Sequence, residues 1–67
     1  MVKIGGGVMT SIMKMKNGTK LIHKRSGLIY TLGGHVNEVA RVIKCDQYIG
    51  QIDYINENTQ NDYEVAE

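Results

Sequence analysis

The stretch MKNGTKLIHKRSGLIYTL, residues 15–32, contains two turn signals with strand-forming residues between and after them. Residues 19–24 (TKLIHK) and 28–32 (LIYTL) lie on either side of a short segment that ends in Ser26 and Gly27. Ser and Gly are typical turn residues, and Gly27 can take the left-handed conformation that a tight turn requires. The stretch therefore predicts a β-hairpin.

The dipeptide Asn17-Gly18 is the other turn signal, because both residues tolerate a positive φ. It could join residues 11–16 to residues 19–24 as a tight hairpin, or it could form the turn that precedes the first strand. Neither face of the tight hairpin would be cleanly apolar. We therefore favour the turn before the first strand.

The segment HVNEVARVIKC, residues 35–45, fits both regular structures. Val36, Val39, Ala40 and Ile43 have helical spacing, whereas alternate residues also fit a strand, and a segment this short cannot be assigned by periodicity alone. Its β-branched content favours the strand.

Three further segments complete the prediction. Residues 48–55 (YIGQIDYI) alternate as a strand does, and Gly50 indicates a bulge or a close approach there. Residues 56–61 form a polar loop, and residues 62–67 a short last strand. About five short strands with frequent turns are typical of a small all-β barrel or sandwich.

The order NGTKLIHKRSGLIYTL, RVIKCDQYIGQIDYI and DYEVAE, within residues 17–66, resembles the small five-stranded barrels of the Src-homology-3 (SH3) type found in bacterial and phage proteins. The resemblance implies an SH3-like barrel. Peptide-binding members of that fold use aromatic grooves, whereas this chain contains no Trp. A fold of this kind is shared by unrelated functions.

Two domain regions are predicted: a flexible N-terminal arm over residues 1–12 and one small β domain over residues 13–67. The glycines of IGGGVM, residues 4–9, are typical of a loose leader. Glycine codons there can also form a ribosome-binding sequence upstream of a start at Met9, which would indicate a bacterial or phage gene. The ordinary flexible N-terminus and the start at Met9 both stay open.

The net charge of +1 is unevenly distributed, because all eight Lys and Arg precede Cys45 and most acids follow it. The basic side chains form the one constellation that could bind phosphates, with Tyr30 or Tyr48 as a stacking platform. They are Lys14, Lys16, Lys20, Lys24, Arg25, Arg41 and Lys44. In a small barrel the first and last strands are neighbours, so Lys20, Lys24 and Arg25 could instead face Asp62, Glu64 and Glu67. We favour this neutralised surface.

No catalytic, metal or cofactor site is predicted. His23, His35, Cys45 and Asp46 lack the paired spacing of zinc ligands. The candidate nucleophiles Cys45, Ser11 and Ser26 have no surrounding motif, and neither glycine run continues as a phosphate loop. A single cysteine permits no internal disulfide. The chain also lacks an apolar run long enough to span a membrane, and we expect a cytoplasmic protein.

Tyrosines and methionines are the remaining candidates for a binding surface. Tyr48 and Tyr54 could anchor the core with their hydroxyl groups at its edge. Alternatively they form a protein-contact patch, because Tyr and Met are enriched at interfaces. The patch predicted for a partner contains Met13, Met15, Tyr30, Tyr48 and Tyr54, with Met9 as a further arm residue.

These features predict a non-catalytic binding module that contacts another protein, such as a phage-encoded inhibitor or adaptor of a host protein. The alternative is a small nucleic-acid-binding barrel that uses the basic residues 14–25. A third option is a self-assembling component, that is, a homo-oligomer.

Overall fold

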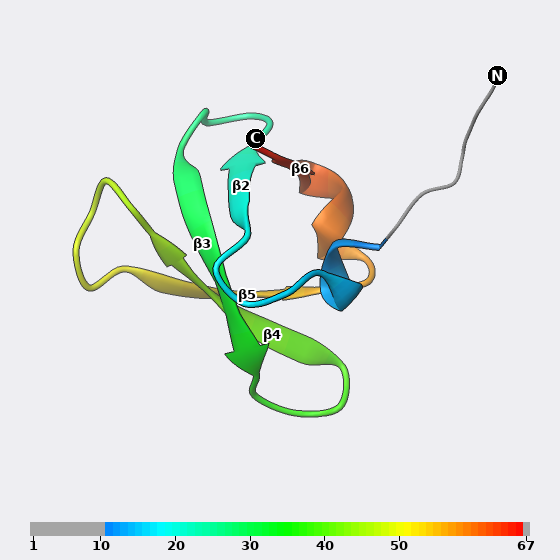
Figure 1. Ribbon diagram of the computed structural model, residues 1–67. Coiled ribbons are helices and arrows are strands. Elements are labelled where there is room, and N and C mark those ends of the chain that lie inside the picture. Colours follow the sequence, from blue (N-terminus) through cyan, green and yellow to red (C-terminus); the bar gives the residue numbers. More distant parts are fainter. Residues whose placement is uncertain (1–10, 67) are drawn as a thin grey trace, which may run out of the picture.

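The computed structural model describes residues 11–66, and five antiparallel strands run through them in one curled sheet (Figure 1). The strands are β2 (Lys20–His23), β3 (Ile29–His35), β4 (Ala40–Cys45), β5 (Ile52–Asn56) and β6 (Tyr63–Val65). Two 3₁₀ helices, η1 (Ile12–Lys14) and η2 (Thr59–Asp62), complete the elements. The strand order is β5-β4-β3-β2-β6, so β5 and β6 are the edges. The described part of the chain is thus an all-β half-barrel, without an α-helix.

The predicted hairpin is confirmed. Strands β2 and β3 pair antiparallel, with Lys20 opposite Thr31 and Leu21 opposite Tyr30. The turn between them is closed by the amide N–H of Gly27, which donates to the carbonyl of His23 at 2.8 Å. Gly27 has a φ of 78°, the left-handed value that the turn chemistry requires.

Asn17-Gly18 forms the turn before β2, as favoured from the sequence. Gly18 has a φ of 93°, and its N–H donates to the carbonyl of Leu32 at 2.8 Å. No hairpin precedes it among the described residues, because residues 12–14 form the 3₁₀ helix η1 instead. Ser11 caps this helix by accepting a hydrogen bond from the N–H of Met13 at 3.2 Å.

The strand reading of residues 35–45 is confirmed for its second half. Strand β4 pairs with β3 on one side and with β5 on the other, which excludes the helical alternative. Residues 36–39 form the preceding turn, and the side-chain oxygen of Asn37 accepts the N–H groups of Val39 and Ala40 at 2.8 and 2.9 Å.

Strand β5 begins later than predicted. Residues 48–50 are part of a turn, in which the N–H of Gln51 donates to the carbonyl of Tyr48 at 3.0 Å. Gly50, with a φ of 91°, therefore serves the turn and is not a bulge within a strand. The true irregularity of the sheet lies between Leu32 and His35, where the β3–β4 register shifts.

The end of the chain combines an expected strand with an unexpected 3₁₀ helix. The predicted loop 56–61 contains most of η2, whose first turn is held by the side-chain oxygen of Asn56. The predicted last strand is confirmed as β6, which pairs with β2 as expected for the first and last strands. The helix η2 packs against both β5 and β6 and so connects the two edges of the sheet.

The core lies on the concave face of the sheet. Its fully buried side chains are Leu21, Leu32, Ile43 and Ile55, one from each of four strands. Ile12 of η1 is also buried in this cluster. Ile12, the last residue of the arm predicted over residues 1–12, is therefore part of the fold. Residues 1–10 of that arm, and with them the start proposed at Met9, lie outside the described residues. Between residues 11 and 66 no helix is long and apolar enough to cross a membrane.

Candidate binding surface

Arg41 is a core residue that fastens the N-terminal segment to the sheet. Its side chain is only 3% exposed. Its Nε donates to the carbonyl of Gly33 at 2.9 Å, and its Nη1 donates to the carbonyls of Met13 and Met15. Its Nη2 donates to the side-chain oxygen of Asn17 at 2.6 Å. Every one of these acceptors is neutral, so the guanidinium organises backbone and is not available to a phosphate.

Lys20 belongs to a polar network on the convex face of the sheet. Its Nζ lies 2.7 Å from Asp46 Oδ2 and donates to Thr31 Oγ1, also at 2.7 Å. Thr31 in turn donates to Asp46 Oδ1 at 2.7 Å. The hydrogen bonds from Lys20 and then Thr31 lower the pKa of the Asp46 carboxyl. The ion pair that neutralises Lys20 is therefore formed with Asp46 and not with the last strand.

The structure does not bring the other basic residues together. Lys24 and Arg25 lie at the end of the β2–β3 hairpin, where they line a hollow of about 410 Å³ with His23 and Asp62. Lys44 is paired with Thr31 in register on the convex face, and Lys14 lies in η1. Lys16 lies in the segment between η1 and β2.

An exposed apolar surface runs along β5 and the loop before it. Ile49 is 100% exposed, and the other members, Tyr48, Ile52 and Tyr54, are each at least half exposed. We name these four residues the β5 apolar surface. Both tyrosines were candidate core anchors, but the structure places both at the surface. Tyr48 lies in the turn before β5, and Tyr54 lies on the face of β5 opposite to Ile55, which fills the core.

A hollow of about 470 Å³ lies beside this surface. Ile49 and Ile52 supply apolar lining, and Lys44 and Asp46 supply charges. No ion pair to Lys44 is formed within residues 11–66. The site is thus an apolar hollow with one uncompensated cation beside it.

The remaining members of the predicted patch lie elsewhere. Tyr30 is buried and makes an edge contact with Tyr63, with 5.6 Å between the ring centroids. Burial raises the pKa of both phenols, that of Tyr63 to about 12. Met13 and Met15 are half-buried and pack against the core. A folded chain therefore cannot present Tyr30 to a partner, and the two methionines offer only part of their surface.

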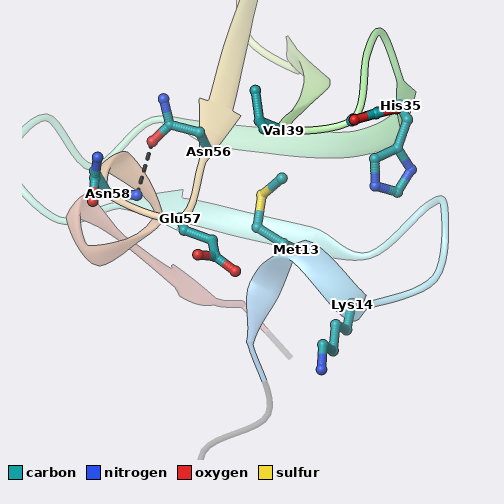
Figure 2. A pocket seen from close by; sticks show the side chains of 8 residues that line it. Met13, Lys14, His35, Val39, Asn56, Glu57 and Asn58 are labelled. Atoms are coloured by element: carbon teal, nitrogen blue, oxygen red, sulfur yellow. Dashed lines mark hydrogen bonds between the residues drawn. The ribbon is translucent and has the colours of Figure 1, made fainter.

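Met13 also lines a second groove, of about 520 Å³, between η1, the β3–β4 turn and the start of the β5–η2 connection (Figure 2). The figure shows its thioether between Val39 and the η1 ribbon, with His35 at one end of the groove and Glu57 toward the other. The rest of the lining consists of Lys14, Glu38, Asn56 and Asn58. Both charge signs are present, and no set of side chains in the groove converges on one point.

The candidate chemical residues are dispersed. Residues 11–66 contain no group of three His, Cys, Asp or Glu side chains that could hold a metal ion. Ser26 Oγ lies 3.1 Å from His23 Nδ1, but the same nitrogen accepts the N–H of Ser26 and the pair lies in the exposed hairpin turn. Cys45 is buried. The hydrogen bonds between Ser26 and His23 stabilise the hairpin turn, and this structural role accounts for them without a catalytic one.

Ile49, Ile52 and Asp53 were not among the candidate functional residues predicted from the sequence. An isoleucine beside Gly50 in the polar run DQYIGQ, residues 46–51, was a usable signal, because a turn gives such a side chain no core to enter. An aspartate in the middle of the apolar run IDYI, residues 52–55, is likewise typical of an edge strand.

Comparison of the chain with models of known protein families, with curated proteins and with solved structures finds no match. The class that the structure itself defines is a small all-β protein with five antiparallel strands in a half-barrel.

Proposed function

We propose that the protein is a non-catalytic binding module that contacts another protein through the β5 apolar surface. The observation that carries this proposal is the exposure of four large apolar side chains within residues 48–54, one of them fully exposed, along the edge strand β5 and the turn before it. Exposed apolar patches mark interaction sites, and tyrosine is enriched in them.

The hollow beside this surface indicates the chemistry of the partner. An apolar side chain of the partner would enter between Ile49 and Ile52, and a neighbouring carboxylate would pair with Lys44. Lys20 contributes less, because Asp46 already neutralises it. The partner is therefore proposed to present an apolar anchor next to an acidic residue.

We also propose that the half-barrel is of the SH3-like type. Supporting this are the strand order β5-β4-β3-β2-β6 and the 3₁₀ helix η2 immediately before the last strand. The partner is proposed to be a host protein, with the chain acting as a phage-encoded inhibitor or adaptor. The support for that part is the resemblance of residues 17–66 to small barrels of bacterial and phage proteins.

A pull-down from bacterial lysate with matched variants tests the proposal. The chain and its Val36→Ser variant should retain the same stoichiometric partner, because Val36 is as exposed as the tyrosines but lies in the β3–β4 turn. The double variant Ile49→Ser with Tyr54→Ser should lose that partner while its circular dichroism stays unchanged. Retention of the same proteins by all three would contradict the proposal.

Chromatography on a nucleic-acid column at low salt is the second test. We expect the column not to retain the protein. Retention that falls steeply with salt, and that is lost in Lys20→Glu with Lys24→Glu, would instead favour the nucleic-acid-binding alternative.

A further inference from the structure

Strand β5 has one side that no other strand of the sheet covers. The N–H of Cys45 donates to the carbonyl of Gln51 at 3.0 Å, so the carbonyl of Gln51 faces β4. Since the directions of the backbone groups alternate along a strand, those of Asp53 and Ile55 also face β4. The backbone groups of Ile52, Tyr54 and Asn56 therefore face away from the sheet, where another strand could pair with them.

Side chains already occupy two of these outward N–H groups. The N–H of Tyr54 donates to the carboxylate oxygen Oδ1 of Asp53 at 2.8 Å. The N–H of Asn56 donates to Thr59 Oγ1 at 2.9 Å. Ile52 has no such side-chain acceptor within the described residues. The open side of β5 is thus capped at its centre and at its end.

We propose that the Asp53 carboxylate closes β5 to pairing with a second copy of this chain. In an antiparallel pair of two β5 strands, Tyr54 would lie opposite Tyr54 of the second copy, and Ile52 opposite Asn56. The central pair of hydrogen bonds would then require both Tyr54 N–H groups. These are the groups that Asp53 occupies in each copy.

The second copy is the relevant partner because the strand is complementary to itself. Both exposed Ile52 and Tyr54 side chains would gain apolar contacts in that pair, which gives an uncapped edge a driving force to associate. The other edge needs less protection, since β6 is only three residues long. This inference concerns the edge backbone, and it stands apart from the side-chain contacts of the proposed function.

The test is the oligomeric state of purified protein, in which a second copy is the only possible partner chain. We expect Asp53→Ala to sediment with a mass that rises with concentration to twice that of the unsubstituted chain. Asp62→Ala removes the same charge from η2 and should remain monomeric. Asp53→Asn keeps a side-chain oxygen for the Tyr54 N–H and should also remain monomeric.

A monomeric Asp53→Ala variant would overturn the proposal, and so would association of the Asp62→Ala control. Association of Asp53→Asn to the same degree as Asp53→Ala would show that the cap is not what closes the edge. Circular dichroism establishes that each variant is folded.

Amide hydrogen exchange of the unsubstituted chain gives a readout that needs no variant. After correction for intrinsic rates, the N–H of Tyr54 should exchange several-fold more slowly than that of Ile52, because only Tyr54 has the Asp53 acceptor. Equal corrected exchange rates for the two N–H groups would contradict the proposal that the Asp53 carboxylate caps the N–H of Tyr54.

Discussion

The buried side chain of Arg41 supplies hydrogen-bond donors that a neighbouring strand would otherwise supply. Residues 13–17 form no strand, and the guanidinium supplies the donors for the carbonyl oxygens of Met13 and Met15 and for the side-chain oxygen of Asn17. The planar fork of Arg reaches several acceptors at once, which a lysine ammonium cannot do in the same geometry. Burial without a carboxylate is tolerated because Nε, Nη1 and Nη2 of Arg41 each donate to a well-placed oxygen.

We expect Arg41→Met to lower the free energy of unfolding by about 2–4 kcal/mol, because it leaves several part-buried carbonyl groups without donors. Lys20→Met is the matched control, since it removes an exposed ion pair and should cost below about 1 kcal/mol. Urea unfolding monitored by circular dichroism measures both. A loss for Arg41→Met no larger than for Lys20→Met would contradict the role given to Arg41.

Among the elements, β3 is shaped by its two glycines. A Cβ on Gly33 would lie 2.6 Å from Val42 Cγ1 and 3.3 Å from the Val42 carbonyl oxygen. A Cβ on Gly34 would meet its nearest atom, Asn17 Nδ2, only at 4.0 Å. The register shift between Leu32 and His35 therefore coincides with a close approach of β3 and β4 at Gly33.

Gly33→Ala should destabilise the fold by about 1–3 kcal/mol through this overlap, as overpacking does elsewhere. Gly34→Ala, one residue away, should have a much smaller effect. Val42→Ala added to Gly33→Ala should restore part of the loss, because it removes the methyl group in closest contact. Thermal unfolding of the four proteins measures this, and equal melting temperatures for the two glycine variants would argue against the close approach.

At the scale of the whole molecule, the fold depends on a small core and on closure by η1 and η2. A chain of this size has a free energy of unfolding of only about 3–10 kcal/mol. Tyr63, on the short strand β6, packs against Tyr30 and His23 and so ties the edge of the sheet to the core. Its protonation state therefore affects global stability.

Alkaline pH should destabilise the protein through Tyr63. Burial first, and then the Asp53 carboxylate, raise the pKa of its phenol from 10.0 to about 12. The unfolded chain therefore releases this proton at lower pH than the folded chain does. The contribution of the protonated Tyr63 phenol to the free energy of unfolding is fully present below pH 10 and is lost as pH rises from 10 to about 12.

Urea unfolding across that pH range measures the effect. Tyr63→Phe should flatten the decline, whereas Tyr48→Phe, at an exposed position, should leave it unchanged. A decline that is the same in Tyr63→Phe as in the unsubstituted chain would assign it to another group.

The sequence by itself determined the presence of the five strands and the two turns around β2. Asn17-Gly18 and Ser26-Gly27 set the two turns around β2, because glycine conformation is a local property of the chain. The β-branched content of residues 35–45 indicated β4, and the alternation within residues 48–55 indicated β5, although it placed the start of that strand too early at residue 48.

Only the tertiary structure decided which side chains are buried and which are exposed. Arg41 is buried and Tyr54 is exposed because of what the neighbouring strands and η1 place against them, and no local pattern encodes that. The capping role of Asp53 depends in the same way on β5 being an edge. Strand order sets these properties, and strand order arises from contacts between residues far apart in the chain.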